Sequence, residues 1–148
     1  MMNKQGKGSN IFIILVPIFL IAALIIADTA VTYNADKTFK KVTEEIIEEV
    51  LNNDELSYDE YNGEIKRLYE LKGYETEMLL VDANSYQIYV ENEHEYFGVF
   101  TSIFGNGKEE IVKVFGIFDF KMKKGSKTSL KVEARFDSND ELQFEYVE

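Results

Sequence analysis

The apolar and polar positions divide the chain into three successive patterns, and the first is an uninterrupted apolar run. Residues 11–27 contain only Ile, Leu, Val, Phe, Ala and the single proline, Pro17. As a helix this run spans about 25 Å, and extension to Tyr33 brings it to about 35 Å. Since the hydrocarbon core of a bilayer is about 30 Å thick, the pattern predicts a tail over residues 1–10 and a transmembrane helix over residues 11–33.

The second pattern has helical periodicity. Over residues 34–53, apolar side chains recur at spacings of three and four, while lysines and glutamates lie on the opposite side. This predicts an amphipathic stalk helix that continues the membrane helix without a break. The apolar positions are Phe39, Val42, Ile46, Ile47, Val50 and Leu51.

A shorter helix is expected next. Ser57 and Glu60 have the spacing of a capping box, in which each side chain accepts a hydrogen bond from the other residue's backbone amide. Gly73 stands where a helix commonly ends in the left-handed conformation. The sequence therefore predicts a second helix between Ser57 and Gly73.

The third pattern alternates with a period of two from Glu75 onward. Its short connections favour antiparallel pairing, and helices pack on one face of such a sheet. Residues 54–148 are expected to form an α+β domain with an antiparallel sheet of about five or six strands. The expected strands are residues 75–82, 85–91, 96–104, 111–120, 129–136 and 142–146.

Charge indicates the orientation and excludes one class of partner. The formal net charge of −11 repels phosphate backbones, so no nucleic-acid partner is expected. Lys4 and Lys7 precede the apolar run closely, whereas the lysines after it, from Lys37 onward, lie beyond a polar spacer. The distribution predicts a single-pass cell-membrane protein with a cytoplasmic N-terminus and an extracytoplasmic C-terminal domain. Membrane lipid is its expected partner.

Three residues of the span have specific expected roles. Pro17 removes a backbone donor and clashes with the carbonyl of Ile13, which predicts a kink. Asp28 is expected to be an interfacial carboxylate in water, or else the partner of a cation on another subunit. Tyr33 is placed for an aromatic ring at the level of the headgroups.

A cleaved signal peptide is the alternative to a retained anchor. Lys4 and Lys7 form a positive n-region, and Ile25-Ile26-Ala27 is a tolerable cleavage sequence. We favour retention because the run is longer than a usual signal peptide's apolar region, and because helical periodicity continues past the potential cleavage point.

No constellation of catalytic residues is recognisable, so no enzyme activity is expected. The chain has no cysteine and one histidine, His94, which we expect in a polar loop. Asp137 and Asn139 have the spacing that begins a calcium loop, but the central glycine is missing, which favours a hairpin turn. No cofactor or metal ion is expected.

Two aromatic segments are unusual because their aromatic residues face both sides of the expected strands. Core packing in the centre of the sheet is the favoured interpretation. The alternative is an interface with a neighbouring subunit. The residues concerned are Tyr96, Phe97, Phe100, Phe115 and Phe118.

The apolar run resembles the N-terminal segment of TadE-like proteins, which are pseudopilin relatives of tight-adherence pili and related secretion systems. Phe12, Pro17 and Asp28 fall at spacings that match the family's Phe, Pro and second acidic residue, and Gly6 stands where the processing glycine is found. Ile11 occupies the position of the family's glutamate. An ordinary bitopic anchor is the competing interpretation of the same residues.

The resemblance implies a pilin-like architecture and a pseudopilin-like or minor-pilin-like structural role in a cell-surface pilus or secretion apparatus. The partners would be pilin-like or secretion-system proteins, in a homo- or hetero-oligomer. The alternative hypothesis is a membrane-tethered extracytoplasmic ligand-binding or sensing module. On the pilin hypothesis, Phe12, Pro17, Asp28 and Tyr33 are the expected residues of assembly in the membrane.

Overall fold

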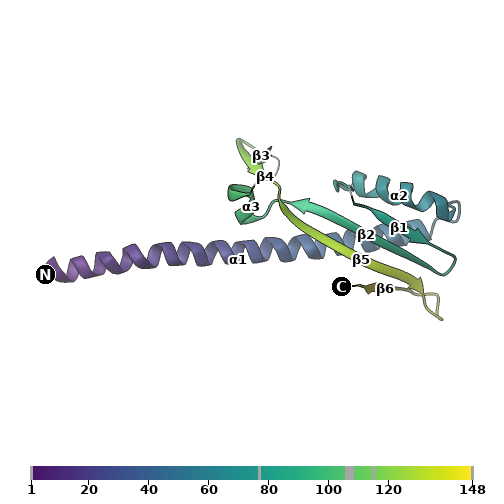
Figure 1. Cartoon of the computed structure of the whole chain (residues 1–148), viewed down its shortest axis with the longest axis horizontal. Coiled ribbons are helices and arrows are strands. Elements are labelled where there is room, and N and C mark those ends of the chain that lie inside the picture. The colour runs from purple at the N-terminus through teal and green to yellow at the C-terminus, as the bar shows by residue number, and fades with distance from the viewer. Residues whose placement is uncertain (1, 77, 106–108, 115, 148) are drawn as a thin grey trace.

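The chain forms one long helix with a small α+β domain along its second half (Figure 1). The computed structural model describes residues 2–76, 78–105, 109–114 and 116–147. Its helices are α1 (Met2–Leu51), α2 (Tyr58–Leu71) and α3 (Val99–Phe104). Its strands are β1 (Leu80–Ala83), β2 (Gln87–Tyr96), β3 (Glu109–Val114), β4 (Phe118–Lys123), β5 (Ser126–Phe136) and β6 (Leu142–Tyr146).

The two predicted helical segments form the single helix α1, as expected. The helix continues through Pro17, and Figure 1 shows a rod without a sharp bend. The expected kink at Pro17 is therefore not seen. Between residues 39 and 50 the predicted apolar stripe is confirmed, since Phe39, Ile46 and Val50 are all fully buried.

The second helix is confirmed between Ser57 and Gly73, with one difference at its start. The Ser57 hydroxyl donates to a Glu60 carboxylate oxygen at 3.0 Å, and the Glu60 amide donates to the Ser57 carbonyl at 3.0 Å. The reciprocal bonds of a capping box are thus replaced by a side chain to side chain bond. Gly73 has φ +84°, the left-handed conformation expected of a helix stop.

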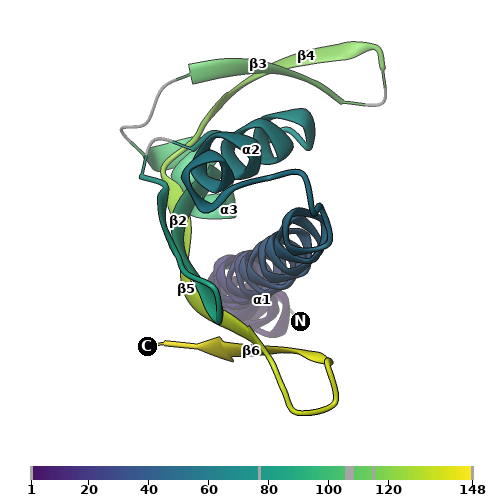
Figure 2. The same cartoon turned by 90° about the vertical axis from the view of Figure 1, so that its right-hand side faces the viewer.

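The main sheet is antiparallel and has the strand order β1-β2-β5-β6. Its inward face carries Ile88 and Val90 from β2 and Val132 and Ala134 from β5, all fully buried. Figure 2 shows α1 and α2 on the same face of this sheet. The predicted α+β class, with helices packed on one face of an antiparallel sheet, is confirmed.

Three predicted strands differ from the structure. The predicted strand 75–82 is replaced by the short strand β1, which begins only at Leu80. Residues 99–104 form the helix α3, because the chain turns out of β2 at Gly98 and the Ser102 amide then donates to the Gly98 carbonyl at 3.0 Å. The predicted strand 111–120 is instead the hairpin β3–β4, which turns at Gly116 with φ +72°. Glycine adopts that φ more readily than other residues because it has no Cβ. The described residues therefore contain six strands, but divided into sheets of four and two.

Candidate functional site

The apolar half of α1, residues 11–27, projects from the domain, and all of its side chains except that of Leu24 are exposed. An 18-residue stretch within Ile11–Leu51 is strongly apolar, and none of it is buried. Phe12 is 69% exposed and Tyr33 67%. The helix is thus long and apolar enough to cross a membrane, and nothing in the described part of the chain covers it.

Asp28 connects the end of this apolar half to the domain. Its carboxylate accepts a hydrogen bond from the backbone amide of Val99 at 3.0 Å, at the first residue of α3. One turn further along α1, the Tyr96 hydroxyl donates to the Thr32 hydroxyl oxygen at 3.0 Å. The half-buried Asp28 side chain therefore stabilises the start of α3 within the same chain, a role that the sequence pattern did not suggest.

An apolar groove of about 750 Å³ lies beside these two contacts. Val31 of α1, Phe97 and Ile103 around α3, and Phe120 and Met122 of β4 contribute to its walls. Val31 places the groove against α1, directly after the apolar half. The groove therefore joins the end of the exposed helix to α3 and the hairpin.

The five aromatic residues of the expected interface do not form one face of a central sheet. Tyr96 binds Thr32, and Phe97 lies under Lys124, whose Nζ is 5.5 Å from the ring centroid. Phe100 is half-buried in α3, and Phe118 is 57% exposed in the hairpin. Phe115 lies outside the described residues. Core packing does not account for Phe118, because this residue lies in the separate two-stranded sheet and no described helix or strand covers its side chain.

His94 lies near the end of β2, so its predicted position in a polar loop was wrong. Its ring packs against Tyr74, with centroids 4.4 Å apart, and against Phe39, with centroids 5.6 Å apart. Burial lowers the pKa of His94, as does the nearby Lys124 charge, whereas Glu75 and Glu95 act in the opposite direction. The ring is therefore held toward its neutral form.

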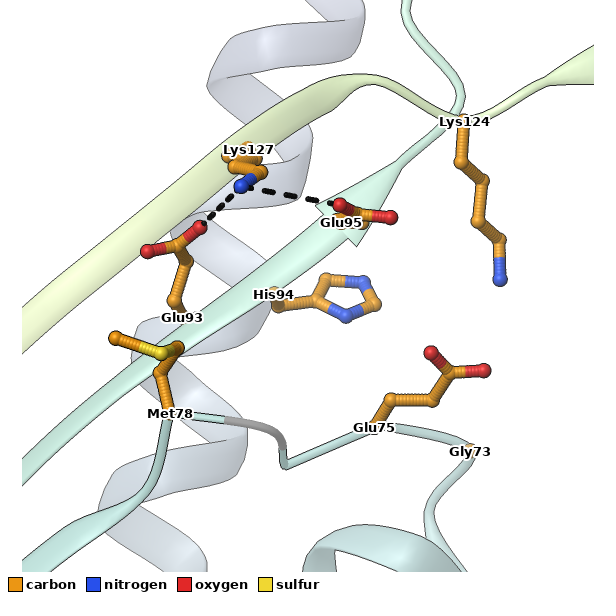
Figure 3. A pocket seen from close by; sticks show the side chains of 8 residues that line it. All are labelled: Gly73, Glu75, Met78, Glu93, His94, Glu95, Lys124 and Lys127. Atoms are coloured by element: carbon orange, nitrogen blue, oxygen red, sulfur yellow. Dashed lines mark ion pairs between the residues drawn. The ribbon is translucent and has the colours of Figure 1, made fainter. Parts of the chain in front are cut away.

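A pocket of about 190 Å³ surrounds His94 (Figure 3). Glu75 and Lys124 face the imidazole from two different connections. Beside them, Lys127 pairs with Glu93 at 3.0 Å and with Glu95 at 3.9 Å. No described residue hydrogen-bonds to the buried Nδ1 of His94.

This arrangement does not form a recognisable catalytic or metal site. Within the described ranges, no three His, Cys, Asp or Glu side chains lie close enough together to hold a metal ion. The pocket is also smaller than the roughly 300–1,000 Å³ that ligand sites commonly have. The pocket therefore offers charge and a neutral imidazole to a small group, but no nucleophile paired with a base.

A buried polar cluster inside the domain was not predicted. The hydroxyls of Thr43 and Tyr69 are 2.5 Å apart, both residues are fully buried, and Asn92 of β2 is 1% exposed. Burial raises the pKa of Tyr69, while Thr43 and Asn92 act in the opposite direction. Thr43 interrupts the apolar stripe of α1 one turn after Phe39. This polar residue within the stripe was the sequence signal that could have indicated a buried polar cluster. The cluster fixes how α1, α2 and β2 pack against one another.

Comparisons with protein-family models, with curated proteins and with solved structures found no match to this chain. The resemblance to TadE-like proteins therefore stays a prediction from the residues of the apolar run.

Proposed function

We propose that this chain is a membrane-anchored, non-catalytic structural subunit of a cell-surface pilus or secretion apparatus, with a pseudopilin-like or minor-pilin-like role. The supporting observation is the division of α1. Residues 11–27 are apolar and almost all exposed, while Phe39, Ile46 and Val50 further along the helix belong to the domain core. A continuous helix therefore ties the membrane span rigidly to the domain, as a subunit that assembles through its helix requires.

The N-terminus lies in the cytoplasm and the domain outside, by the lysine distribution around the apolar run. Phe12, Pro17, Asp28 and Tyr33 face the membrane or a neighbouring subunit in this proposal. Phe12 and Tyr33 are largely exposed and available for such contacts. The Asp28 carboxylate already accepts a hydrogen bond from the Val99 amide, so an additional partner on another subunit would bind to its second oxygen.

Disulfide crosslinking of the full-length chain in membranes tests assembly through the helix. The chain has no cysteine of its own, so Ile14→Cys or Ala22→Cys introduces a single thiol into the apolar half. We expect oxidation to give crosslinked dimers at one or both of these positions. Ser138→Cys, at the exposed turn between β5 and β6, is the matched control and should stay monomeric.

Two results would overturn the proposal in different ways. If both helix variants remain monomeric in the membrane fraction, the chain is an anchor that does not assemble through its span. If the full-length chain is found in the aqueous fraction without detergent, the span itself is wrong. The intact mass of the mature protein adds a third distinction, since a chain that begins at Asp28 would have lost the helix.

A membrane-tethered ligand-binding or sensing module is the second candidate function. The observation that favours it is the His94 pocket, in which a neutral imidazole meets Glu75 and Lys124. The small volume of the pocket makes this candidate the weaker one. This second candidate predicts that neither Ile14→Cys nor Ala22→Cys forms crosslinked dimers in the same experiment.

A further inference from the structure

The unit formed by α3 and the β3–β4 hairpin exposes more apolar surface than a water-facing part of a small domain normally does. Six large apolar side chains of this unit are more than half exposed. They belong to the helix, to both strands and to the turn between them. They are Ile103 59%, Phe104 75%, Ile111 69%, Ile117 79%, Phe118 57% and Phe120 52%.

The strand register shows that the hairpin is amphipathic. Val112 pairs with Phe120, and these residues share a face with Phe118, whose ring centroid is 6.5 Å from that of Phe120. The opposite face carries the pairs Glu109–Lys123, Ile111–Lys121 and Lys113–Asp119, since side chains alternate along each strand, and it is polar except for Ile111. A hairpin of this kind needs a covering layer for its apolar face, because an isolated two-stranded sheet is marginally stable in water.

The position of the unit relative to α1 identifies the covering layer. The hydrogen bonds Asp28–Val99 and Thr32–Tyr96 hold α3 beside the end of the apolar half. From Ile11 to Val31 the helix rises about 30 Å, and the hydrocarbon core is about 30 Å thick. When α1 spans a bilayer from Ile11, Val31 and the groove that it lines therefore lie at the boundary between hydrocarbon and headgroups.

The figures place the hairpin along that boundary. In Figure 1, α3, β3 and β4 lie at the end of the domain nearer the N-terminus. Figure 2 looks along α1 and shows the hairpin extended across the direction of that helix. A helix that crosses the bilayer near its normal would consequently hold the hairpin parallel to the membrane surface.

Charge favours lipid as the occupant. The chain as a whole has 16 basic and 27 acidic residues. Residues 109–124 reverse this balance, with four lysines and three acidic side chains. Of these, Lys121, Lys123 and Glu109 line the groove. Lysines beside exposed aromatic and aliphatic side chains are typical of interfacial segments that bind anionic headgroups.

We infer that α3 and the β3–β4 hairpin are a second membrane contact, docked on the surface of the bilayer that α1 spans. Ile117, Phe118 and Phe120 enter the region between headgroups and acyl chains, while the lysines meet anionic headgroups. This inference rests on the membrane span of the proposed function, but not on assembly into a pilus. With two contacts, the domain has a fixed tilt and rotation over the membrane.

The test uses the full-length protein reconstituted in phosphatidylcholine vesicles that contain phosphatidylglycerol. A polarity-sensitive fluorophore is attached to a single introduced cysteine, Phe118→Cys. The matched control is Tyr86→Cys, at an 83% exposed position between β1 and β2. We expect a blue-shifted emission at residue 118, strong quenching by lipids labelled at a shallow depth, and a several-fold lower quenching constant with aqueous iodide than at residue 86.

A third label, at Phe19→Cys in the apolar half, separates the two proposals. If residue 19 is quenched by deeply labelled lipids but residue 118 is as accessible to iodide as residue 86, the second membrane contact is wrong and the span stands. If residue 19 is not quenched by lipid, the span is wrong as well. Protection of residue 118 from both iodide and lipid quenchers, increasing with the ratio of protein to lipid, would instead mean that a second copy covers the hairpin, which also overturns the inference.

Discussion

Two of the antiparallel hairpins in the described part of the chain, β5–β6 and β3–β4, have the same alternation of apolar and polar side chains but differ in what covers their apolar faces. In β5–β6, the pairs Val132–Tyr146 and Ala134–Phe144 turn an apolar face toward α1, and Val132 and Ala134 are fully buried. In β3–β4, Phe120 is paired with Val112 on an equivalent face, yet it is 52% exposed. Alternation thus determines which side chains share a face, whereas the neighbouring elements determine whether that face is covered.

The position of each hairpin along α1 explains the difference. The β5–β6 hairpin lies against the second half of the helix, where Phe39 and Val50 belong to an apolar stripe that needs a partner. The β3–β4 hairpin and α3 lie where that stripe has not yet begun and the uniformly apolar half ends. In water that hairpin gains little from burial, so its apolar face is more consistent with an apolar environment outside the chain.

The largest expected effect contrasts one side chain from each hairpin. Leu130→Ala in β5 removes a side chain that is 5% exposed, and about 2–5 kcal/mol of the free energy of unfolding should be lost. Phe118→Ala in β4 removes one that is 57% exposed, and the loss should stay within about 0.5 kcal/mol. Urea denaturation of the full-length chain in detergent micelles, followed by circular dichroism, measures both. Equal losses would show that the two hairpins are covered to the same extent.

The next effect concerns the buried polar cluster on the covered side. Tyr69→Phe leaves the Thr43 hydroxyl buried without its partner and should lower the free energy of unfolding by about 1–3 kcal/mol. The double variant Thr43→Val/Tyr69→Phe should recover part of that loss, because the Thr43 hydroxyl is then no longer left buried without a partner.

The control for the cluster is Tyr86→Phe, which removes the hydroxyl of an 83% exposed side chain and should leave stability unchanged. The same urea denaturation in micelles applies. A double variant that is less stable than Tyr69→Phe alone would mean that the cluster does not hold the helices and the sheet together through this pair.

The sequence was sufficient to predict the elements that depend on neighbouring residues and that pack against other parts of the same chain. The periodicity of α1, the stop at Gly73 and the β5–β6 hairpin depend on spacing and on turn residues, and all three were predicted. The predicted strand 96–104 failed because its aromatic and β-branched residues favour a strand while the backbone leaves the sheet at Gly98. The Asp28 carboxylate that stabilises the start of α3 lies 71 residues away from Val99 in the sequence, so the pattern of residues 96–104 gives no sign of it.

The candidate site was predictable only in part for the same physical reason. The apolar run is a property of consecutive residues and was recognised directly. The His94 pocket and the groove beside Val31 each combine elements that are distant in the sequence, so no spacing rule brings them together. His94 was misplaced because its neighbours Glu93 and Glu95 are polar, although in a strand they point to the face opposite to His94.

Asp28 holds the uncovered unit in place, and its removal should have a smaller, local effect. Asp28→Ala deletes the acceptor of the Val99 amide, a loss comparable to that of a helix cap, about 0.5–2 kcal/mol. Hydrogen exchange of the full-length chain in micelles should become faster in α3, with no change at β5. Asp28→Asn keeps an oxygen acceptor and should exchange at close to the original rate. Unchanged exchange in Asp28→Ala would mean that α3 is held by other contacts.

The smallest expected effect lies at the junction of the covered and uncovered regions, where β2 leads into α3. Burial, and then the Lys124 charge, lower the pKa of His94, against the opposing influence of Glu75 and Glu95. The unfolded chain therefore binds a proton at His94 at a higher pH than the folded chain. Stability is at its full value above the unfolded pKa of about 6.5 and decreases as the pH falls through the lowered folded pKa.

His94→Gln removes this titration without introducing a charge, so its stability should decrease less than that of the original chain as the pH falls from neutral into the acidic range. Lys124→Gln should give an intermediate pH dependence, because burial still lowers the pKa of His94 while the neighbouring positive charge is gone. Urea denaturation in micelles at several pH values measures all three proteins. Identical pH dependence in the original chain and in His94→Gln would show that the His94 ring is hydrated rather than packed against Phe39 and Tyr74. The junction between the two regions would then be open to water.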